Sequence, residues 1–144
     1  MSDAGATADL LLLEDNPQDL ELALRALRRA GINNSIRVVR DGVEALAWIL
    51  AEPAPMPKLI LLDLKVPKVS GLDVLRRVKE DPRTRGIPVV VLTSSREQVD
   101  VSECYRLGAN SYVVKPVEFD RFAAVVRQIG QYWLQVNQPQ KVVE

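Results

Sequence analysis

The sequence predicts an α/β fold in which a parallel sheet of five strands is covered by helices on both faces. Strand and helix patterns alternate five times along the 144 residues. The strands read as short, nearly continuous apolar runs, which is typical of strands buried on both faces. The helices carry apolar residues at three- and four-residue spacing along one face. Right-handed crossovers between such units produce a doubly wound (βα)5 arrangement.

The five expected strands are short and rich in Leu, Ile and Val. They lie at residues 9–14, 35–40, 59–62, 87–93 and 111–114. The proline-rich segment 53–57 excludes a helix just before the third strand. The second strand alternates polar and apolar residues and delivers no functional group, so we place it at an edge of the sheet. We therefore expect the strand order 2-1-3-4-5.

Capping residues mark where three of the helices begin. Asn16 followed by Pro17 starts the first helix, because asparagine accepts hydrogen bonds from the first turn and proline fits the first helical position. Asp41 and Ser70 start the second and third helices, each with an acidic residue three positions later. Gly108 closes the fourth helix.

The last helix is expected over residues 118–136, and its apolar stripe is longer than the sheet requires. A helix of this length measures about 28 Å, whereas a short strand spans about 17 Å. The second half of the stripe, which includes Ile129, Tyr132 and Trp133, is therefore expected to overhang the sheet. Aromatic-rich surface of this kind typically marks an interface. We predict a symmetric homodimer through this helix, with the tail beyond it crossing or flanking the partner.

Length and composition fit one globular domain, which we place at residues 8–137. Residues 1–7 and 138–144 are expected to be tails that are flexible or contact a partner. Nineteen basic residues balance nineteen acidic ones, which gives no basic field for binding nucleic acid or membrane. No signal sequence, no apolar stretch of about 20 residues and a single cysteine favour a cytoplasmic location. No DNA-binding domain is expected after residue 144.

Polar groups follow four of the five strands at their carboxyl ends. They are Glu14, Asp15, Asp63, Thr93 and Lys115. In doubly wound sheets these ends meet at one edge, where ligands bind. Converging carboxylates repel by about 4 kcal/mol per pair at roughly 4 Å, so the site requires a compensating cation. With no histidine in the chain, the oxygen-only donor set favours Mg²⁺ or Mn²⁺ and excludes imidazole zinc sites.

Four segments occur in the order and spacing of a known family: LLLLEDNPQD, LILLDLKVPKVSGLDVLRRVK, IPVVVLTSS and GANSYVVKPVEFDRF. Over about residues 8–130 the chain resembles the CheY-like receiver domain of two-component response regulators, whose fold is flavodoxin-like. Two further segments, EDNPQDLELALRALRRAG and YWLQVNQP, resemble stand-alone regulators that serve phytochrome-type sensor kinases.

The resemblance implies a phosphorylation site. Asp63 would accept a phosphoryl group from a phosphohistidine of a sensor histidine kinase. Glu14, Asp15 and Asp63, with the backbone carbonyl of Lys65, would hold Mg²⁺, and Lys115 would pair with the phosphoryl group. The protein would then catalyse its own phosphorylation and dephosphorylation and would not be an enzyme that acts on other substrates.

The resemblance also implies a conformational switch. The hydroxyl of Thr93 would bond to the phosphoryl group, and Tyr112 would change rotamer with it. This would alter the surface formed by the last two strand–helix units. The peptide bond between Lys115 and Pro116 would be cis.

Other classes of protein remain alternatives. A phosphatase of the haloacid-dehalogenase type also uses an aspartate after a strand, but it needs a second aspartate where Lys65 stands. A flavodoxin-like flavin binder needs a hydroxyl- and glycine-rich loop where Glu14 and Asp15 would repel phosphate. A pseudo-receiver would have lost part of the site. Among receivers, the alternatives are a non-phytochrome sensor kinase and a role mainly as a phosphate sink.

Overall fold

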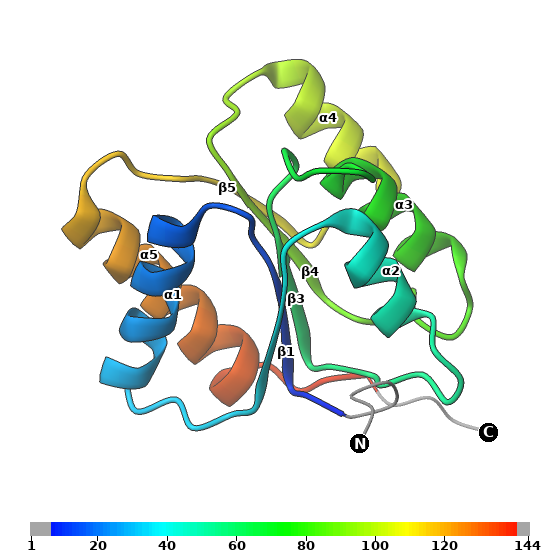
Figure 1. The fold of residues 1–144 in the computed structure, drawn as a ribbon, viewed down its shortest axis with the longest axis horizontal. Helices are drawn as coiled ribbons and strands as arrows, with labels where there is room; N and C mark the ends of the chain where they lie inside the picture. Colours follow the sequence, from blue (N-terminus) through cyan, green and yellow to red (C-terminus); the bar gives the residue numbers. More distant parts are fainter. Residues whose placement is uncertain (1–6, 141–144) are drawn as a thin grey trace.

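A parallel sheet of five strands lies between two layers of helices (Figure 1). The structure is a computed structural model that describes residues 7–140. The strand order is the predicted one, β2-β1-β3-β4-β5, and every pairing is parallel. In that order the strands are Ile36–Val39, Leu10–Leu13, Leu59–Leu62, Val89–Thr93 and Ser111–Val114. The doubly wound fold is therefore confirmed.

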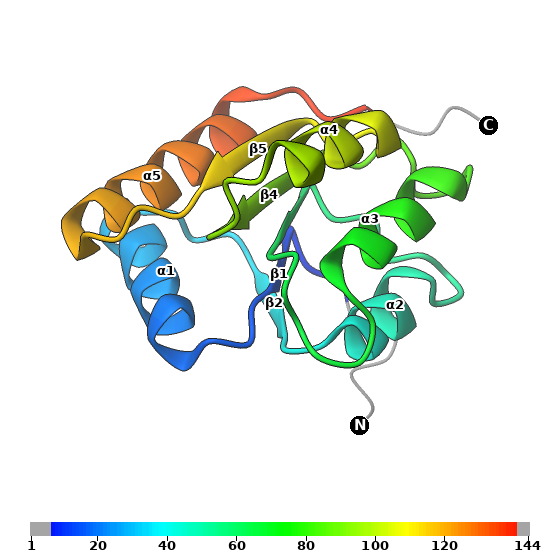
Figure 2. The ribbon, with the colours of Figure 1, turned by 90° about the horizontal axis from the view of Figure 1, so that it is seen from above.

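Two helices cover one face of the sheet and three cover the other (Figures 1 and 2). On one face, α1 (Pro17–Arg29) and α5 (Phe119–Gln131) lie side by side. The other face carries α2 (Gly42–Ile49), α3 (Gly71–Glu80) and α4 (Gln98–Leu107) in sequence order. No helix within residues 7–140 is long and apolar enough to cross a bilayer.

Each face of the sheet has its own apolar core. Side chains along a strand point alternately to opposite faces, and β1 follows this rule. Leu11 and Leu13 belong to the buried cluster under α2 and α3, whereas Leu10 and Leu12 belong to the cluster under α1 and α5. All four leucines are almost fully buried, which explains why this strand is a continuous apolar run.

The register of the strands brings their carboxyl ends level with one another. Leu13 at the end of β1 pairs with Leu62 at the end of β3, so the next residues, Glu14 and Asp63, lie side by side. The N–H of Asp63 donates to the carbonyl of Leu13 at 3.1 Å, which continues the ladder past the last strand residue. On the other side of the sheet, Thr93 pairs with the last residue of β5.

The predicted caps are present at the helix starts. The side chain of Asn16 accepts hydrogen bonds from the first turn of α1, at 2.9 and 3.1 Å. Asp41 and Ser70 accept in the same way from the residue three positions later, at 2.8 and 3.2 Å. Gly108 ends α4 with φ of 108°, a conformation that glycine adopts without steric cost.

The last helix differs from the expectation. The α-helix ends at Gln131 and continues as one π-helical turn, η1 (Tyr132–Val136). Ile129 is buried within the single chain, so the expected overhang is wrong for this residue. The reason is that α1 lies against this half of α5: a Cβ added at Gly130 would be 2.5 Å from Leu27 of α1.

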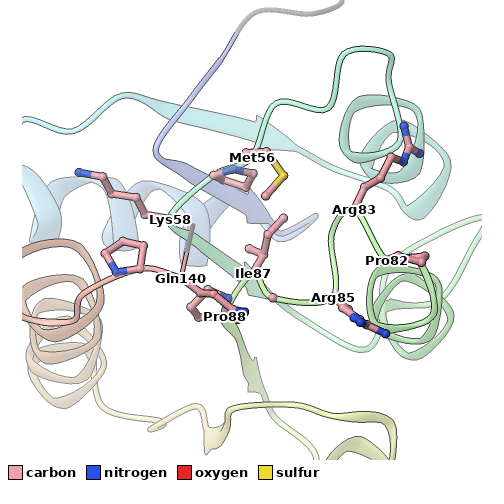
Figure 3. A pocket seen from close by; sticks show the side chains of 11 residues that line it. Met56, Lys58, Pro82, Arg83, Arg85, Ile87, Pro88 and Gln140 are labelled. Carbon is pink, nitrogen blue, oxygen red and sulfur yellow. The ribbon is translucent and has the colours of Figure 1, made fainter. Parts of the chain in front are cut away.

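The tail after η1 lies against the body of the same chain as far as residue 140. Pro139 and Gln140 line a cavity of about 760 Å³ at the amino ends of β3 and β4, opposite the edge that carries the predicted site (Figure 3). The neighbouring wall is formed by the turn before β4, where Gly86 faces the side chain of Gln140. The predicted tail segments 1–6 and 141–144 fall outside the described residues.

Candidate functional site

The ammonium group of Lys115 is the centre of the site. Its Nζ lies 2.7 Å from Glu14 Oε1, 2.7 Å from Asp63 Oδ2 and 2.9 Å from Asp19 Oδ2. Glu14, Asp63 and Lys115 are all buried, whereas Asp19 is half-buried. One cation therefore holds three carboxylates together at the carboxyl edge of the sheet.

The backbone around these side chains is fixed by hydrogen bonds. The N–H of Lys115 donates to the carbonyl of Thr93 at 2.8 Å, so the end of β5 stays attached to β4. Asp63 uses its second carboxylate oxygen, Oδ1, to accept from the N–H of Lys65 at 3.2 Å. Glu14 likewise accepts from the N–H of Asn16 at 3.2 Å. Each acidic side chain thus has one contact to Lys115 and one to the loop that follows its strand.

The first turn of α3 presses against the backbone of Asp63. A Cβ built on Gly71 would lie 2.0 Å from the Asp63 carbonyl oxygen and 2.7 Å from the Cα of Leu64. The N–H of Gly71 donates to the carbonyl of Leu64 at 2.9 Å. Only glycine permits this close approach, which sets the position of the loop between β3 and α3.

Asp19 is a site residue that the sequence reasoning missed. It lies in the first turn of α1, and its backbone N–H donates to the side chain of the N-cap residue Asn16. Because α1 begins only a few residues after β1, its first turn stays at the carboxyl edge of the sheet. An acidic residue in that turn was the available signal.

Asp15 occupies a different position from its neighbour Glu14. Its side chain is exposed, and it is not among the carboxylates that contact Lys115. The predicted acidic pair is therefore divided in this structure, with Glu14 inward and Asp15 toward solvent. Lys65 is also exposed, and its contact with the site is the backbone N–H that bonds to Asp63.

Thr93 places a buried hydroxyl at the end of β4. Thr93 is 0% exposed, and its Oγ1 is a buried side-chain oxygen that lacks a hydrogen-bond partner within residues 7–140. Buried polar atoms are nearly always paired, and an unpaired one calls for an explanation. A ligand at the carboxyl edge that accepts a hydrogen bond would satisfy this hydroxyl.

Tyr112 points toward the β4–α4 loop. Its hydroxyl donates to the carbonyl of Ser95 at 2.9 Å, and its half-buried ring packs against the core under α2 and α3. Ser95 itself is buried, and its hydroxyl donates to Asp100 in the first turn of α4. The predicted switch residues are therefore linked by the β4–α4 loop, which follows Thr93 and contacts the hydroxyl of Tyr112 at Ser95.

Charge and burial act on the site in opposite directions. Burial raises the pKa of Glu14 above its ordinary value, and its contacts with Lys115 oppose that rise. For Lys115, burial alone would lower the pKa, but hydrogen bonds to Asp63, Glu14 and Asp19 outweigh burial and raise the pKa of the ammonium group. Lys115 is therefore held in its charged form.

The donor chemistry of the site fits a hard divalent cation. Glu14, Asp15 and Asp63 supply carboxylate oxygens, and the described part of the chain brings no histidine or cysteine near them. Their present arrangement is not that of a metal cage, since no group of three acidic residues among residues 7–140 is disposed to hold an ion. Glu14 and Asp63 face Lys115, and Asp15 would have to turn inward from solvent.

The expected cis peptide bond at Lys115–Pro116 is wrong. Within the described residues the cis bond lies at Glu52–Pro53. Bonds before proline favour the trans form by about 0.5–1 kcal/mol, and the bond at Lys115–Pro116 keeps that preferred form.

Comparison with known proteins identifies the family. The sequence model of the response regulator receiver domain family matches residues 10–127. The methanogenesis regulatory protein FilR2 of Methanothrix harundinacea, described as probable, is 40% identical over 131 residues, which is 89% of this chain and 84% of that protein. Response regulator Rcp1 of Synechocystis is 37% identical over 130 residues, 88% of each chain.

Solved structures agree with the sequence comparison. The phosphorylated cyanobacterial phytochrome response regulator RcpA superposes with a TM-score of 0.87 at 35% identity, covering 94% of this chain and all of that one. The Mn²⁺-bound form of Rcp1 superposes with a TM-score of 0.86 at 35% identity, covering 92% of this chain and 98% of that one.

Proposed function

This chain belongs to the response regulator receiver domain family, and we propose that it is a signalling protein that Asp63 switches by accepting a phosphoryl group from a sensor histidine kinase. The observation that carries the proposal is the unpaired hydroxyl of Thr93, buried at the end of β4, at the same edge of the sheet as the paired Asp63 and Lys115. An aspartyl phosphate would place acceptor oxygens where this hydroxyl has no partner.

The chemistry assigned to the site is nucleophilic transfer at phosphorus. A carboxylate oxygen of Asp63 forms the new bond to phosphorus, and the bond from phosphorus to the kinase histidine breaks. Bound Mg²⁺ would offset the charge of the phosphoryl oxygens; Glu14, Asp15 and Asp63 are the residues that would hold it. Hydrolysis of the acyl phosphate later restores Asp63. The chain thus catalyses its own modification and acts on no separate substrate.

In this scheme Lys115 pairs first with carboxylates and then with the phosphoryl group. Before transfer it forms ion pairs with Asp63, Glu14 and Asp19. After transfer the phosphoryl group adds about 1.5 to 2 negative charges, which makes its oxygens the stronger partners for the ammonium group. Lys115 then moves toward the phosphoryl oxygens, and the hydroxyl of Thr93 donates to another of them.

In this proposal the conformational change at the site is transmitted through Tyr112. The shift of Thr93 displaces the β4–α4 loop, whose Ser95 carbonyl accepts from the Tyr112 hydroxyl. Loss or strengthening of that hydrogen bond changes the surface formed by α4, β5 and α5. A receiver of this kind acts on its partners by presenting two alternative surfaces.

The sensor kinase is assigned to the phytochrome class. Support comes from the likeness to RcpA and Rcp1, of which RcpA is named a phytochrome response regulator. FilR2, named for methanogenesis regulation, supports the alternative of another class of histidine kinase. Phosphotransfer rates from a phytochrome kinase and a non-phytochrome kinase of the same organism distinguish the two: faster labelling from the latter removes the phytochrome assignment.

The reaction belongs in the cytoplasm, where these kinases hold ATP.

A homodimer through the last helix completes the proposal. Tyr132 is 49% exposed and packs edge-on against Trp133, with ring centroids 5.0 Å apart. Val136 and Phe119 are also exposed along α5 and η1. Sedimentation at tens of micromolar compares the wild type with Tyr132→Glu. A dimer that persists in the variant moves the interface elsewhere, and a monomeric wild type removes it.

Intact-mass measurement tests the proposed function itself. Wild-type protein incubated with acetyl phosphate and Mg²⁺ gains the mass of one phosphoryl group, and Asp63→Asn gains none. Excess EDTA prevents the gain if the cation takes part. An equal gain in Asp63→Asn would show that another residue accepts the group.

A further inference from the structure

The hydroxyl of Tyr105 in α4 accepts a hydrogen bond from the backbone N–H of Tyr112 in β5, at 3.1 Å. β5 is an edge strand, because β4 is its only neighbour in the sheet. The outward N–H groups of an edge strand ordinarily face water. Here the hydroxyl of Tyr105, from α4, replaces that water as the hydrogen-bond acceptor. The N–H that donates to it belongs to Tyr112, the residue proposed as the switch.

Tyr112 is held at a second point by the same helix. Its own hydroxyl donates to the Ser95 carbonyl at 2.9 Å, and the Ser95 hydroxyl donates to Asp100 at the start of α4. The hydrogen bonds therefore close a ring that leaves α4 at Asp100, passes through Ser95 and Tyr112, and returns to α4 at Tyr105. Moving any member stretches a bond to α4.

Helix α4 packs on the core through few side chains, among them Cys104 and the partly buried Leu107. All its residues are described, and Cys104 is the one that is buried. Tyr105 is half exposed, at 50%, so packing does not fix its ring as it would in a core. The hydrogen bond of Tyr105 therefore adds a directional contact to the limited packing between α4 and β5.

We propose that Tyr105 is a positioning residue that ties α4 to Tyr112, so that α4 follows Tyr112 when the site at Asp63 changes state. The resting contact stands on the geometry alone, whereas the transmission of the signal rests on the proposed phosphorylation of Asp63. With the hydroxyl present, β5 and α4 move as one unit. Without it, Tyr112 and the helix move independently.

Amide exchange tests the resting contact. The chain has three tyrosines, so ¹⁵N-tyrosine labelling gives an NMR spectrum in which each amide can be assigned by substitution. Tyr105→Phe removes only the hydroxyl and should speed exchange at the Tyr112 amide about tenfold, as expected for one lost hydrogen bond. Val99→Ala changes an exposed side chain of the same helix and is the control, with no change expected at Tyr112. Unchanged exchange in Tyr105→Phe overturns the proposal.

Cysteine reactivity tests the transmission. Cys104 is the single cysteine, it is buried in α4, and burial raises its pKa to about 11. Its rate of reaction with a thiol reagent therefore reports how often α4 opens. Beryllofluoride with Mg²⁺, which mimics an aspartyl phosphate, should change that rate several-fold in the wild type and in Val99→Ala. In Tyr105→Phe it should leave the rate unchanged while ¹⁹F NMR shows the mimic bound as tightly as in the wild type.

Two outcomes separate this proposal from the one on which it rests. A Tyr105→Phe protein whose Cys104 still responds to beryllofluoride as the wild type does overturns the role of Tyr105 in transmission. A wild type that binds no beryllofluoride contradicts the proposed function instead. In that case the exchange rate of the Tyr112 amide alone decides whether Tyr105 ties α4 to β5.

Discussion

Asp19 Oδ2 lies 2.9 Å from the Nζ of Lys115, although the two residues are 96 positions apart in the chain. The contact gives Lys115 a third carboxylate beside Glu14 and Asp63. In the proposed reaction Lys115 must turn toward the phosphoryl oxygens, and Asp19 competes with them for the ammonium group. Asp19 also adds negative charge to a site that has to receive more of it.

Replacing Asp19 should therefore favour the phosphorylated form. Asp19→Asn removes the competing charge and keeps the size of the side chain, and the affinity for beryllofluoride should rise about fivefold, as expected for a partly exposed ion pair worth about 1 kcal/mol. Titration followed by ¹⁹F NMR measures this affinity. Glu21→Gln is the control, because Glu21 is an exposed carboxylate of α1 whose ion pair is with Arg25. Equal affinities in both variants would contradict the competition.

Removing Lys115 should destabilise the fold unless a cation replaces it. Lys115→Met leaves buried Glu14 and Asp63 without their counter-charge, a loss of about 3 kcal/mol in the free energy of unfolding. Millimolar Mg²⁺ should recover part of this loss in the variant and have a smaller effect on the wild type. Urea unfolding with and without Mg²⁺ measures both effects.

Lys68→Met serves as the control, because Lys68 is exposed and its ion pair with Asp41 spans 3.5 Å. It should change the free energy of unfolding by less than about 1 kcal/mol. If Mg²⁺ stabilises Lys115→Met no more than it stabilises the wild type, the carboxylates do not bind the cation in place of the lysine.

Gly71 should not tolerate a methyl group. In Gly71→Ala the new Cβ would meet the backbone of Asp63 and Leu64, which cannot rotate away as a side chain would. We expect a loss of about 3 kcal/mol and a fall in Tm of about 10 °C. Gly86→Ala is the control, because its Cβ would meet only the flexible end of Gln140, at 3.0 Å. Similar thermal unfolding of the two variants would contradict the close approach.

Lys79 gives the stability of the fold a pH dependence far from the site. Its Nζ donates to the carbonyls of Arg85 and Ile87 and to Asn110 Oδ1, at 3.0, 2.7 and 3.2 Å. Burial lowers its pKa from the ordinary 10.5 to about 8. Between these values the unfolded chain holds a proton that the folded chain has lost, so the contribution of Lys79 to stability rises with pH.

Lys79→Met should remove that rise. At pH 7 the variant also leaves three oxygens without their donor, which costs about 1–3 kcal/mol. Urea unfolding at several pH values between 7 and about 10 measures the difference between wild type and variant. Lys58→Met, which shares none of these acceptors, should run parallel to the wild type. A wild-type curve with no more slope than that of Lys79→Met would contradict the lowered pKa.

Local signals in the sequence were sufficient to predict the sheet and the position of most site residues. Continuous apolar runs gave the strands, and capping residues such as Asn16 and Ser70 gave the helix starts, because these depend on neighbours in the chain. Glu14, Asp63, Thr93 and Lys115 could be brought to one edge because the carboxyl ends of parallel strands coincide. The register of β1 with β3 and of β4 with β5 confirms that placement.

What the sequence did not reveal depends on contacts between distant segments. The burial of Ile129 follows from how α1 meets α5, and the contact of Asp19 with Lys115 follows from the direction in which α1 leaves the sheet. The spacing of apolar residues along the sequence predicts neither of these two contacts. The same holds for the Tyr105 hydroxyl at the β5 edge. The trans bond at Lys115–Pro116 went against the expectation from resemblance, which carries a family's average and not this chain's own packing.

The most direct test of Asp63 as the phosphoryl acceptor is chemical identification of the modified residue. Borohydride reduces an aspartyl phosphate to homoserine and leaves a free carboxylate unchanged. After acetyl phosphate and Mg²⁺ treatment followed by borohydride, peptide mass spectrometry should find homoserine at position 63 and at no other acidic position, and none in Asp63→Asn. Reduction at Asp15 or Asp19, or equal reduction at position 63 in excess EDTA, would contradict the Mg²⁺-dependent phosphorylation of Asp63.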